Sequence, residues 1–143
     1  MRIGIDLRWL QRAYLNSPEG AVGGVAAVIE NLWHGLSEIA PDTALVGLAN
    51  KGPVPAALAT LVKKTPHAEL HSFGLHGLFP PLDGRWKYAN VAYLLEAECG
   101  MGLALRRLRL DVLHMGDHTA PPRGIGCPTV VTLHEFFADA RAG

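Results

Sequence analysis

The sequence is short of charge and of cysteine, and each shortage excludes a class of protein. Only 18% of the 143 residues are charged, so the chain is not a disordered acidic or basic tail. Basic residues number 13 and acidic residues also number 13, so the excess positive charge that attracts nucleic acid is missing. The two cysteines, Cys99 and Cys127, form neither a CxxC pair nor a metal-type cluster. They favour reduced thiols in a cytosolic protein over a disulfide framework.

Long apolar runs are missing as well. No run approaches the ~18 residues that a membrane span needs. The opening segment MRIGIDLRWL carries charges at Arg2, Asp6 and Arg8, unlike a signal peptide. We therefore expect a cytoplasmic protein that touches the inner face of the membrane at most. Hydrophobic residues make up 49% of the chain, which is enough for one domain with a true core.

Short apolar segments alternate with helical patterns along the chain. We expect helices over 53–64, most of 85–110 and from 135 to 140, a loop over 8–20, and strands over 2–7, 43–49, 68–73, 112–115 and 129–133. This alternation is typical of right-handed crossovers and a mostly parallel sheet. The predicted fold is α/β, a Rossmann-like parallel sheet of order 3-2-1-4-5 flanked by helices.

The longest early helix is expected to begin near Gly24 and to end before Pro41. Its apolar residues recur at helical spacing, which predicts that they face the core. They are Val25, Val28, Ile29, Leu32, Leu36 and Ile39.

A parallel sheet of this kind binds ligands outside the carboxyl ends of its strands. That rule selects the candidate site residues before any family is considered. They are Asp6 after the first strand, the pair Gly23 and Gly24, then Asp117 and His118 after the fourth strand, and His134 with Glu135 after the fifth.

The pair Gly23 and Gly24 opens a helix whose free N–H groups suit an anion such as a diphosphate. The plainer interpretation is a strand-to-helix turn, and on the residues alone both stay open. The dinucleotide fingerprint GxGxxG is absent, and the second strand leads to Asn50, with no carboxylate placed for a ribose. NAD binding is therefore not expected.

His134 follows the fifth strand, where a histidine can hydrogen-bond a sugar hydroxyl or stabilise developing charge. The alternative is a capping or core histidine. Glu135 could orient the imidazole or cap the next helix. His114 and His118 have a spacing that suits a metal only on a helix, and Gly116 between them argues against one, so no metal site is expected. The GxSxG and GxxxxGK[ST] motifs are also absent, which removes the common hydrolase and P-loop interpretations.

Three segments resemble the family 4 glycosyltransferases: MRIGIDLRWL, GAVGGVAAVIENLWHGL, and LRRLRLDVLHMGDHTAPPRGIGCPTVVTLHEF. The resemblance implies the two-domain GT-B fold. It implies that the N-terminal domain binds the acceptor and that a C-terminal domain binds a nucleotide-diphosphate sugar. The pair Gly23 and Gly24 would approach the donor diphosphate, and His134 would contact the transferred sugar. No metal or other cofactor is implied.

The family often has Asp where this chain has Glu135, and nothing follows Gly143. The resemblance therefore implies that residues 1–143 are a truncated acceptor-side domain, without the donor-binding domain and inactive alone. The alternative is a non-catalytic carbohydrate-binding or interaction module on the same scaffold. A half-site of this kind predicts self-association. The cluster Arg106, Arg107 and Arg109 could contact anionic lipid or form a solvated helix end.

Overall fold

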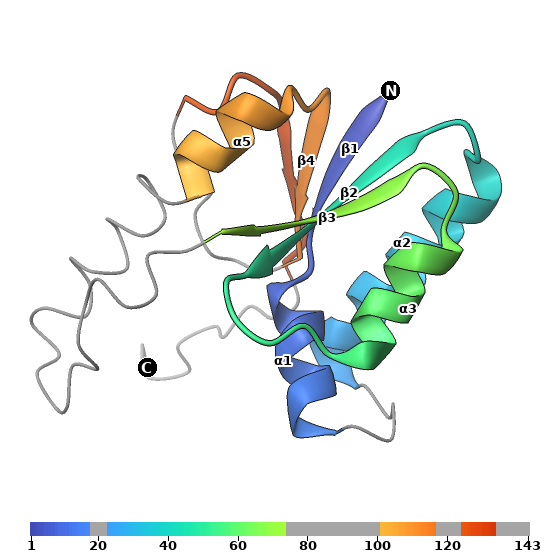
Figure 1. Cartoon of the computed structure of the whole chain (residues 1–143). Coiled ribbons are helices and arrows are strands. Elements are labelled where there is room, and N and C mark those ends of the chain that lie inside the picture. Colours follow the sequence, from blue (N-terminus) through green and yellow to red (C-terminus); the bar gives the residue numbers. More distant parts are fainter. Residues whose placement is uncertain (18–22, 74–100, 117–123, 134–143) are drawn as a thin grey trace, which may run out of the picture.

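A single parallel sheet organises the chain, and a computed structural model describes residues 1–17, 23–73, 101–116 and 124–133 of it (Figure 1). The strands are β1 (Arg2–Asp6), β2 (Ala44–Asn50), β3 (Ala68–Phe73), β4 (Val112–Met115) and β5 (Thr129–Val131). They pair in the order β3-β2-β1-β4-β5, and every pairing is parallel. The predicted α/β fold and strand order are confirmed.

Helices cover the two faces of the sheet unequally. The helices α1 (Arg8–Asn16), α2 (Gly24–Ile39) and α3 (Ala56–Lys64) lie on one face, and α5 (Gly102–Leu108) lies on the other (Figure 1). Because side chains alternate across a strand, each face builds its own apolar core. The first contains Ile3, Ile5, Leu7, Leu10, Tyr14, Ala26, Ile29, Trp33, Leu45, Leu58, Leu61 and Val62. The second contains Val46, Leu48, Phe73, Met101, Leu105, Leu110, Leu113 and Met115.

The segment after β1 is a helix, so the predicted loop over 8–20 is wrong for its first half. The breakers that suggested a loop begin only at Asn16, which ends α1. Upstream of it, Leu10 and Tyr14 recur at i and i+4 and are both buried in the first core. Burial of these two side chains stabilises a helix here, although most of the residues around them are polar.

The predicted start and end of α2 are confirmed, but its buried stripe is rotated from the predicted one. The buried side chains are Ala26, Ile29 and Trp33, whereas Val28 and Ile39 are exposed. Trp33 is the largest of them, and its indole Nε1 donates to Thr65 Oγ1 at 2.9 Å. An aromatic ring of this size sets the helix rotation.

The remaining boundaries differ little from prediction. The helix expected over 53–64 begins at Ala56, because Pro55 takes the N-cap position. The last turn of α5 contains Arg106 and Arg107, but Arg109 is the C-cap with a left-handed φ of 50° and lies outside the helix. The helices expected before Met101 and after Leu133 lie outside the described residues.

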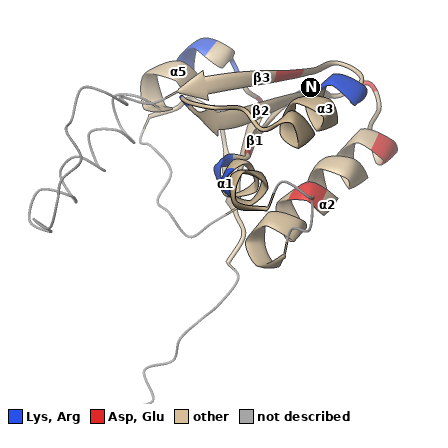
Figure 2. Cartoon of the chain, turned by 60° about the horizontal axis from the view of Figure 1, so that its bottom comes forward, with Lys and Arg blue, Asp and Glu red and all other residues tan. Residues whose placement is uncertain are grey.

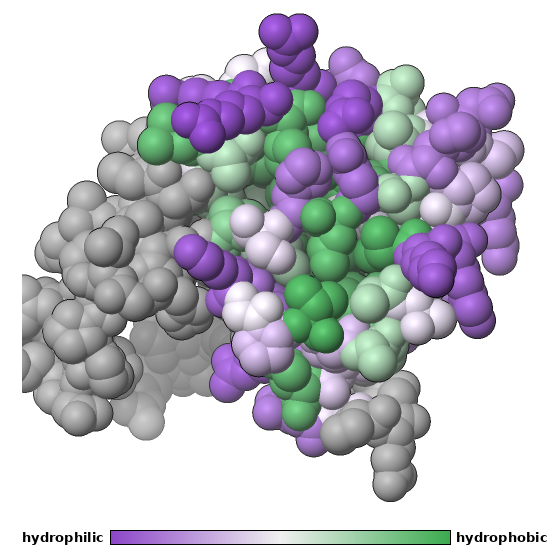
Figure 3. Space-filling model, in the orientation of Figure 1, coloured by the Kyte–Doolittle hydropathy of each residue, from purple (hydrophilic) through white to green (hydrophobic). Residues whose placement is uncertain are grey.

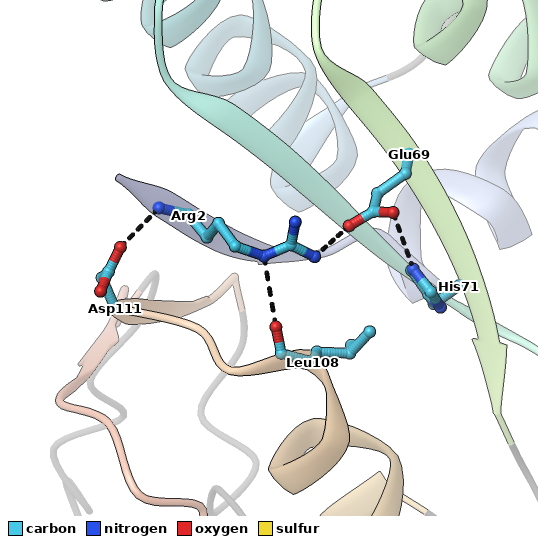
Figure 4. Close-up of polar contacts among 5 residues, drawn as sticks. All are labelled: Arg2, Glu69, His71, Leu108 and Asp111. Atoms are coloured by element: carbon cyan, nitrogen blue, oxygen red, sulfur yellow. Dashed lines mark hydrogen bonds and ion pairs between the residues drawn. The ribbon is translucent and has the colours of Figure 1, made fainter.

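A polar cluster connects the amino ends of β1 and β3 and the segment before β4 (Figure 4). The Arg2 backbone N–H donates to Asp111 Oδ2 at 2.7 Å, and its Nε donates to Leu108 O at 3.2 Å. Its Nη2 pairs with Glu69, which also contacts His71 Nε2 at 3.3 Å. Burial alone raises the pKa of Glu69, but the hydrogen bond to His71 and the charge of Arg2 outweigh it and lower the pKa. The cluster joins β1 to β3 and to the α5–β4 connection, at the edge away from the predicted ligand site.

In the described part of the chain, no helix is both long and apolar enough to cross a membrane.

Candidate functional site

The candidate site lies where the parallel strands end. β1 ends at Asp6, β2 at Asn50, β3 at Phe73 and β4 at Met115, so their carboxyl ends meet at one edge of the sheet. This edge is the one that leads into α1 (Figure 1). It is where open parallel sheets place their ligands.

The Asp6 carboxylate is buried and hydrogen-bonded to Arg8. Arg8 Nε donates to Asp6 Oδ1 at 2.9 Å, and Arg8 Nη2 donates to Oδ2 at 2.7 Å. The Arg8 backbone N–H also donates to Oδ1, at 3.1 Å. The Asp6 side chain is 1% exposed and the Arg8 side chain 21%. A contribution of Asp6 to acceptor binding would therefore act through Arg8, and its predicted role stays a prediction.

Arg8 also reaches the end of β3. Its guanidinium carbon lies 5.9 Å from the centroid of the Phe73 ring, in a cation–π contact. Phe73 itself is buried in the second core. The guanidinium thus links the end of β1 to the end of β3. In the ion pair of Arg8 with Asp6, Arg8 is the more exposed side chain.

Gln11 fixes the loop that follows β2, and the sequence gave no motif to reveal it. Its Nε2 donates to Asn50 O at 3.1 Å and to Pro53 O at 3.0 Å. Its Oε1 accepts from Asn50 N at 2.8 Å. The side chain is buried, so it takes the place of a neighbouring strand for these backbone groups. The one sequence signal is its position between Leu10 and Tyr14, on the buried side of α1.

Packing against the described residues does not explain the glycine pair. Gly23 is the N-cap of α2 in an extended conformation, with φ −130° and ψ 174°. Gly24 has a φ of +56°, in the left-handed region that favours glycine. A Cβ atom built on either residue meets nothing within 4 Å among the described residues. The described residues therefore leave space at the opening of α2, and its predicted diphosphate role stays a prediction.

Gly116 has a packing role that the sequence did not indicate. A Cβ atom there would lie 2.5 Å from Ile29 Cδ1 and 2.6 Å from Ile29 Cγ1. The chain leaving β4 therefore passes directly against α2. Since Ile29 is fully buried, it has no room to move aside.

His114 is part of the sheet, next to Ile5 in register. Its Nε2 lies 2.8 Å from Thr132 Oγ1, which joins β4 to the segment after β5. Among the described residues no three His, Cys, Asp or Glu side chains gather closely enough to hold a metal ion. The suggested metal partner His118 and its neighbour Asp117 lie outside the described residues.

The predicted catalytic residues His134 and Glu135 also lie outside the described residues. The fifth strand, expected to run to Leu133, ends at Val131, so His134 is not the first residue after it. Thr132 still donates its N–H to Met115 O at 3.0 Å, which carries the chain one residue further along β4. Leu133, the next residue, is exposed.

Compared with protein family models, with curated proteins and with solved structures, the chain shows no match in any of the three. The resemblance to the family 4 glycosyltransferases therefore stays a prediction from the sequence.

Proposed function

We propose that the chain is the acceptor-side, N-terminal domain of a retaining glycosyltransferase of the GT-B type. The complete enzyme transfers a sugar from a nucleotide-diphosphate sugar to a glycan, lipid or small-molecule acceptor held on this domain. In this proposal the donor nucleotide is bound mainly by a second domain, and residues 1–143 alone do not turn over.

The observation that carries the proposal is the opening of α2. Two glycines stand where the described residues leave room for larger side chains, one of them extended and one left-handed. A diphosphate approaching the backbone N–H groups of a 16-residue helix would use that room. The left-handed φ of Gly24 by itself favours glycine, so Gly23, extended and not crowded by the described residues, is the position that packing and backbone leave unexplained.

The pairing at the end of β1 agrees with this chemistry. Both oxygens of Asp6 accept hydrogen bonds from Arg8, so this carboxylate is not placed to act as a general base. In the proposed retaining reaction the leaving diphosphate helps to deprotonate the acceptor. The proposed contact to the transferred sugar is His134.

The test is an assay of the complete gene product with a panel of nucleoside-diphosphate sugars and saccharide acceptors. We expect release of the nucleoside diphosphate together with a glycosidic product that keeps the anomeric configuration of the donor, read by proton NMR. Gly23→Val, which adds bulk where there is space, is expected to weaken donor use at least tenfold through the lost diphosphate contacts. Its matched control is Gly35→Ala, in the same helix, where an added Cβ also meets nothing within 4 Å.

An inverted product would contradict the retaining mechanism. Saccharide binding without any transfer, under conditions where Gly23→Val behaves like the parent, would replace the proposal by a non-catalytic carbohydrate-binding module.

A further inference from the structure

The solvent side of α1 carries an aromatic ring with an arginine stacked on it. Trp9 is 38% exposed, although it lies only three residues beyond Asp6, the buried end of β1. The Arg12 guanidinium carbon lies 5.7 Å from the centroid of the Trp9 ring. The two residues are at i and i+3, so they share one face of the helix. The opposite face, with Leu10, Gln11 and Tyr14, is buried.

The positive charge on this helix is only partly compensated. α1 has the sequence RWLQRAYLN, with two arginines and no acidic residue, and Figure 2 shows basic but no acidic positions on it. Arg8 is neutralised by Asp6. Arg12 is exposed and forms no ion pair with a carboxylate in the described part of the chain, where it contacts the Trp9 ring. One positive charge thus remains beside an exposed indole.

We propose that Trp9 and Arg12 form the binding subsite for a sugar phosphate, which is the acceptor of the reaction proposed above. Only the role of this ligand as the acceptor rests on the function proposed above; its binding to Trp9 and Arg12 does not. The apolar C–H face of a pyranose would stack on the exposed part of the indole, a large amphipathic ring. The phosphate would pair with the guanidinium, whose fork of N–H donors matches phosphate geometry.

The position of α1 favours this pair over other exposed basic residues. α1 starts directly after Leu7, beyond the carboxyl end of β1, where parallel sheets bind ligands. Arg107 is also exposed, but it lies near the end of α5 that leads into the start of β4, at the opposite edge. The surface around α1 mixes hydrophobic and hydrophilic residues, as Figure 3 shows for the face that includes α1. Val54, in the loop that Gln11 holds, and Leu15 on α1 are among the exposed apolar side chains.

The two parts of the subsite serve different parts of the ligand. Removing the indole takes away the stacking surface for the ring of the sugar. Removing the guanidinium takes away the charge that selects the phosphate. A neutral sugar and a bare phosphate should each satisfy one half, and only the sugar phosphate should satisfy both.

The experiment is a titration of the 143-residue chain, labelled with nitrogen-15, with glucose 6-phosphate, glucose and inorganic phosphate in separate arms. The indole N–H signals are followed by NMR. We expect the shifts of the Trp9 signal to give a Kd for glucose 6-phosphate that is at least tenfold lower than the Kd for glucose or for inorganic phosphate. The Trp33 signal should stay in place, because that indole is buried and bonded to Thr65.

Arg12→Gln is expected to weaken glucose 6-phosphate binding about tenfold, the loss of one charge-assisted contact. Trp9→Ala, followed by calorimetry because its signal is lost, should weaken binding by a similar factor. The matched control is Arg107→Gln, which should bind like the parent. An unmoved Trp33 signal in Arg12→Gln shows that this variant is folded, so the test does not depend on Trp9→Ala.

Equal affinity for inorganic phosphate would overturn the inference in favour of a simple anion contact. Equal loss in Arg12→Gln and Arg107→Gln would overturn it in favour of general charge attraction. Because these arms measure binding by this chain, they are independent of turnover. Tight glucose 6-phosphate binding in a protein without transferase activity would leave the subsite standing and remove the proposed function.

Discussion

The carboxylate of Asp6 and the guanidinium of Arg8, two residues apart, meet in a two-point ion pair at the end of β1. The pair has an asymmetry that decides what each residue contributes. The Asp6 side chain is almost fully buried, whereas one-fifth of the Arg8 side chain reaches solvent. Removing Arg8 would leave a charge with little access to water, and removing Asp6 would leave a charge that water can reach.

We therefore predict that Arg8→Met lowers the free energy of unfolding by about 3 kcal/mol, because it strands the Asp6 carboxylate. Asp6→Asn should cost about half as much, since the amide keeps one acceptor and the guanidinium can be hydrated. Urea unfolding followed by circular dichroism measures both. Arg12→Met, in the same helix and exposed, is the control and should change stability by less than about 0.5 kcal/mol. Equal losses in Arg8→Met and Arg12→Met would show that the ion pair contributes nothing.

Gln11 gives a second prediction, because its amide has to donate and accept at once. In Gln11→Glu a carboxylate would face the carbonyl oxygens of Asn50 and Pro53, which now receive a donated hydrogen bond. We expect a loss of about 3 kcal/mol at neutral pH. Part of it should return as the pH falls through the raised pKa of that carboxyl, because the protonated group can again donate one hydrogen bond.

The measurement is the urea midpoint of parent and Gln11→Glu at pH 7 and pH 5. Gln11→Ala separates charge from lost bonding, since it should lose stability equally at both pH values. A pH-independent deficit in Gln11→Glu would mean that the carboxylate escapes into water.

The glycines provide a third prediction, which separates crowded positions from open ones. A Cβ atom on Gly47 in β2 would lie 2.6 Å from Leu7 Cδ1 and 3.1 Å from Leu70 Cδ1. Gly47→Ala should therefore cost about 1–3 kcal/mol through overpacking. Gly23→Ala, at an extended and uncrowded position, should leave thermal stability unchanged within about 0.5 kcal/mol. A thermal melt of both variants decides this, and a strongly destabilised Gly23→Ala would mean that the glycine pair has a packing role after all.

Much of this fold could be predicted from the sequence because the strands of a parallel sheet are continuous apolar runs bounded by turn residues. β3 and β4 were predicted to the residue, and β2 within one residue at each end. The helix α1 was missed because only two of its residues, Leu10 and Tyr14, carry the apolar period, and a cluster of breakers follows closely. The rotation of α2 was missed because the longest stripe in the sequence is not the one that holds Trp33.

The site was less predictable than the fold, for a physical reason. Element ends follow from local pattern, so Asp6 could be placed at the end of β1 and the glycine pair at the start of α2. The partners of those residues depend on contacts between segments distant in sequence. The reach of Arg8 to Phe73 and the three bonds of Gln11 to the loop after β2 leave no period or motif in the chain.

Tyr14 gives a fourth prediction, on pH dependence. Burial, the hydrogen bond from its hydroxyl to Glu30 and the charge of Glu30 all raise the pKa of Tyr14 above its usual range. In the unfolded chain the phenol ionises near its ordinary value of about 10. Above that pH the unfolded state loses a proton that the folded state keeps, so stability is full below about pH 10 and falls as the pH rises further.

Tyr14→Phe should cost about 1 kcal/mol at pH 8, where it removes one hydrogen bond. At pH 11 the difference from the parent should shrink, because the variant has lost this alkaline sensitivity. Urea midpoints at the two pH values measure the effect, and the other two tyrosines are present in both proteins. A constant difference between parent and variant at pH 8 and pH 11 would show that Tyr14 ionises as readily in the folded state as in the unfolded one.

The fifth prediction concerns His134, which the sequence places after β5 and which the resemblance assigns to the transferred sugar. A hydrogen bond that strengthens as charge develops on the sugar appears in turnover more than in substrate binding. His134→Ala in the complete gene product should therefore lower kcat roughly ten- to a thousandfold, with KM for the donor and the unfolding midpoint nearly unchanged. His71→Ala is the matched control, because His71 contacts Glu69 near the amino ends of the strands, and its kcat should stay at the parent value. Normal turnover in His134→Ala would leave this histidine with a capping or packing role. A loss seen only in KM would instead place it in ground-state binding of the donor, away from the developing charge.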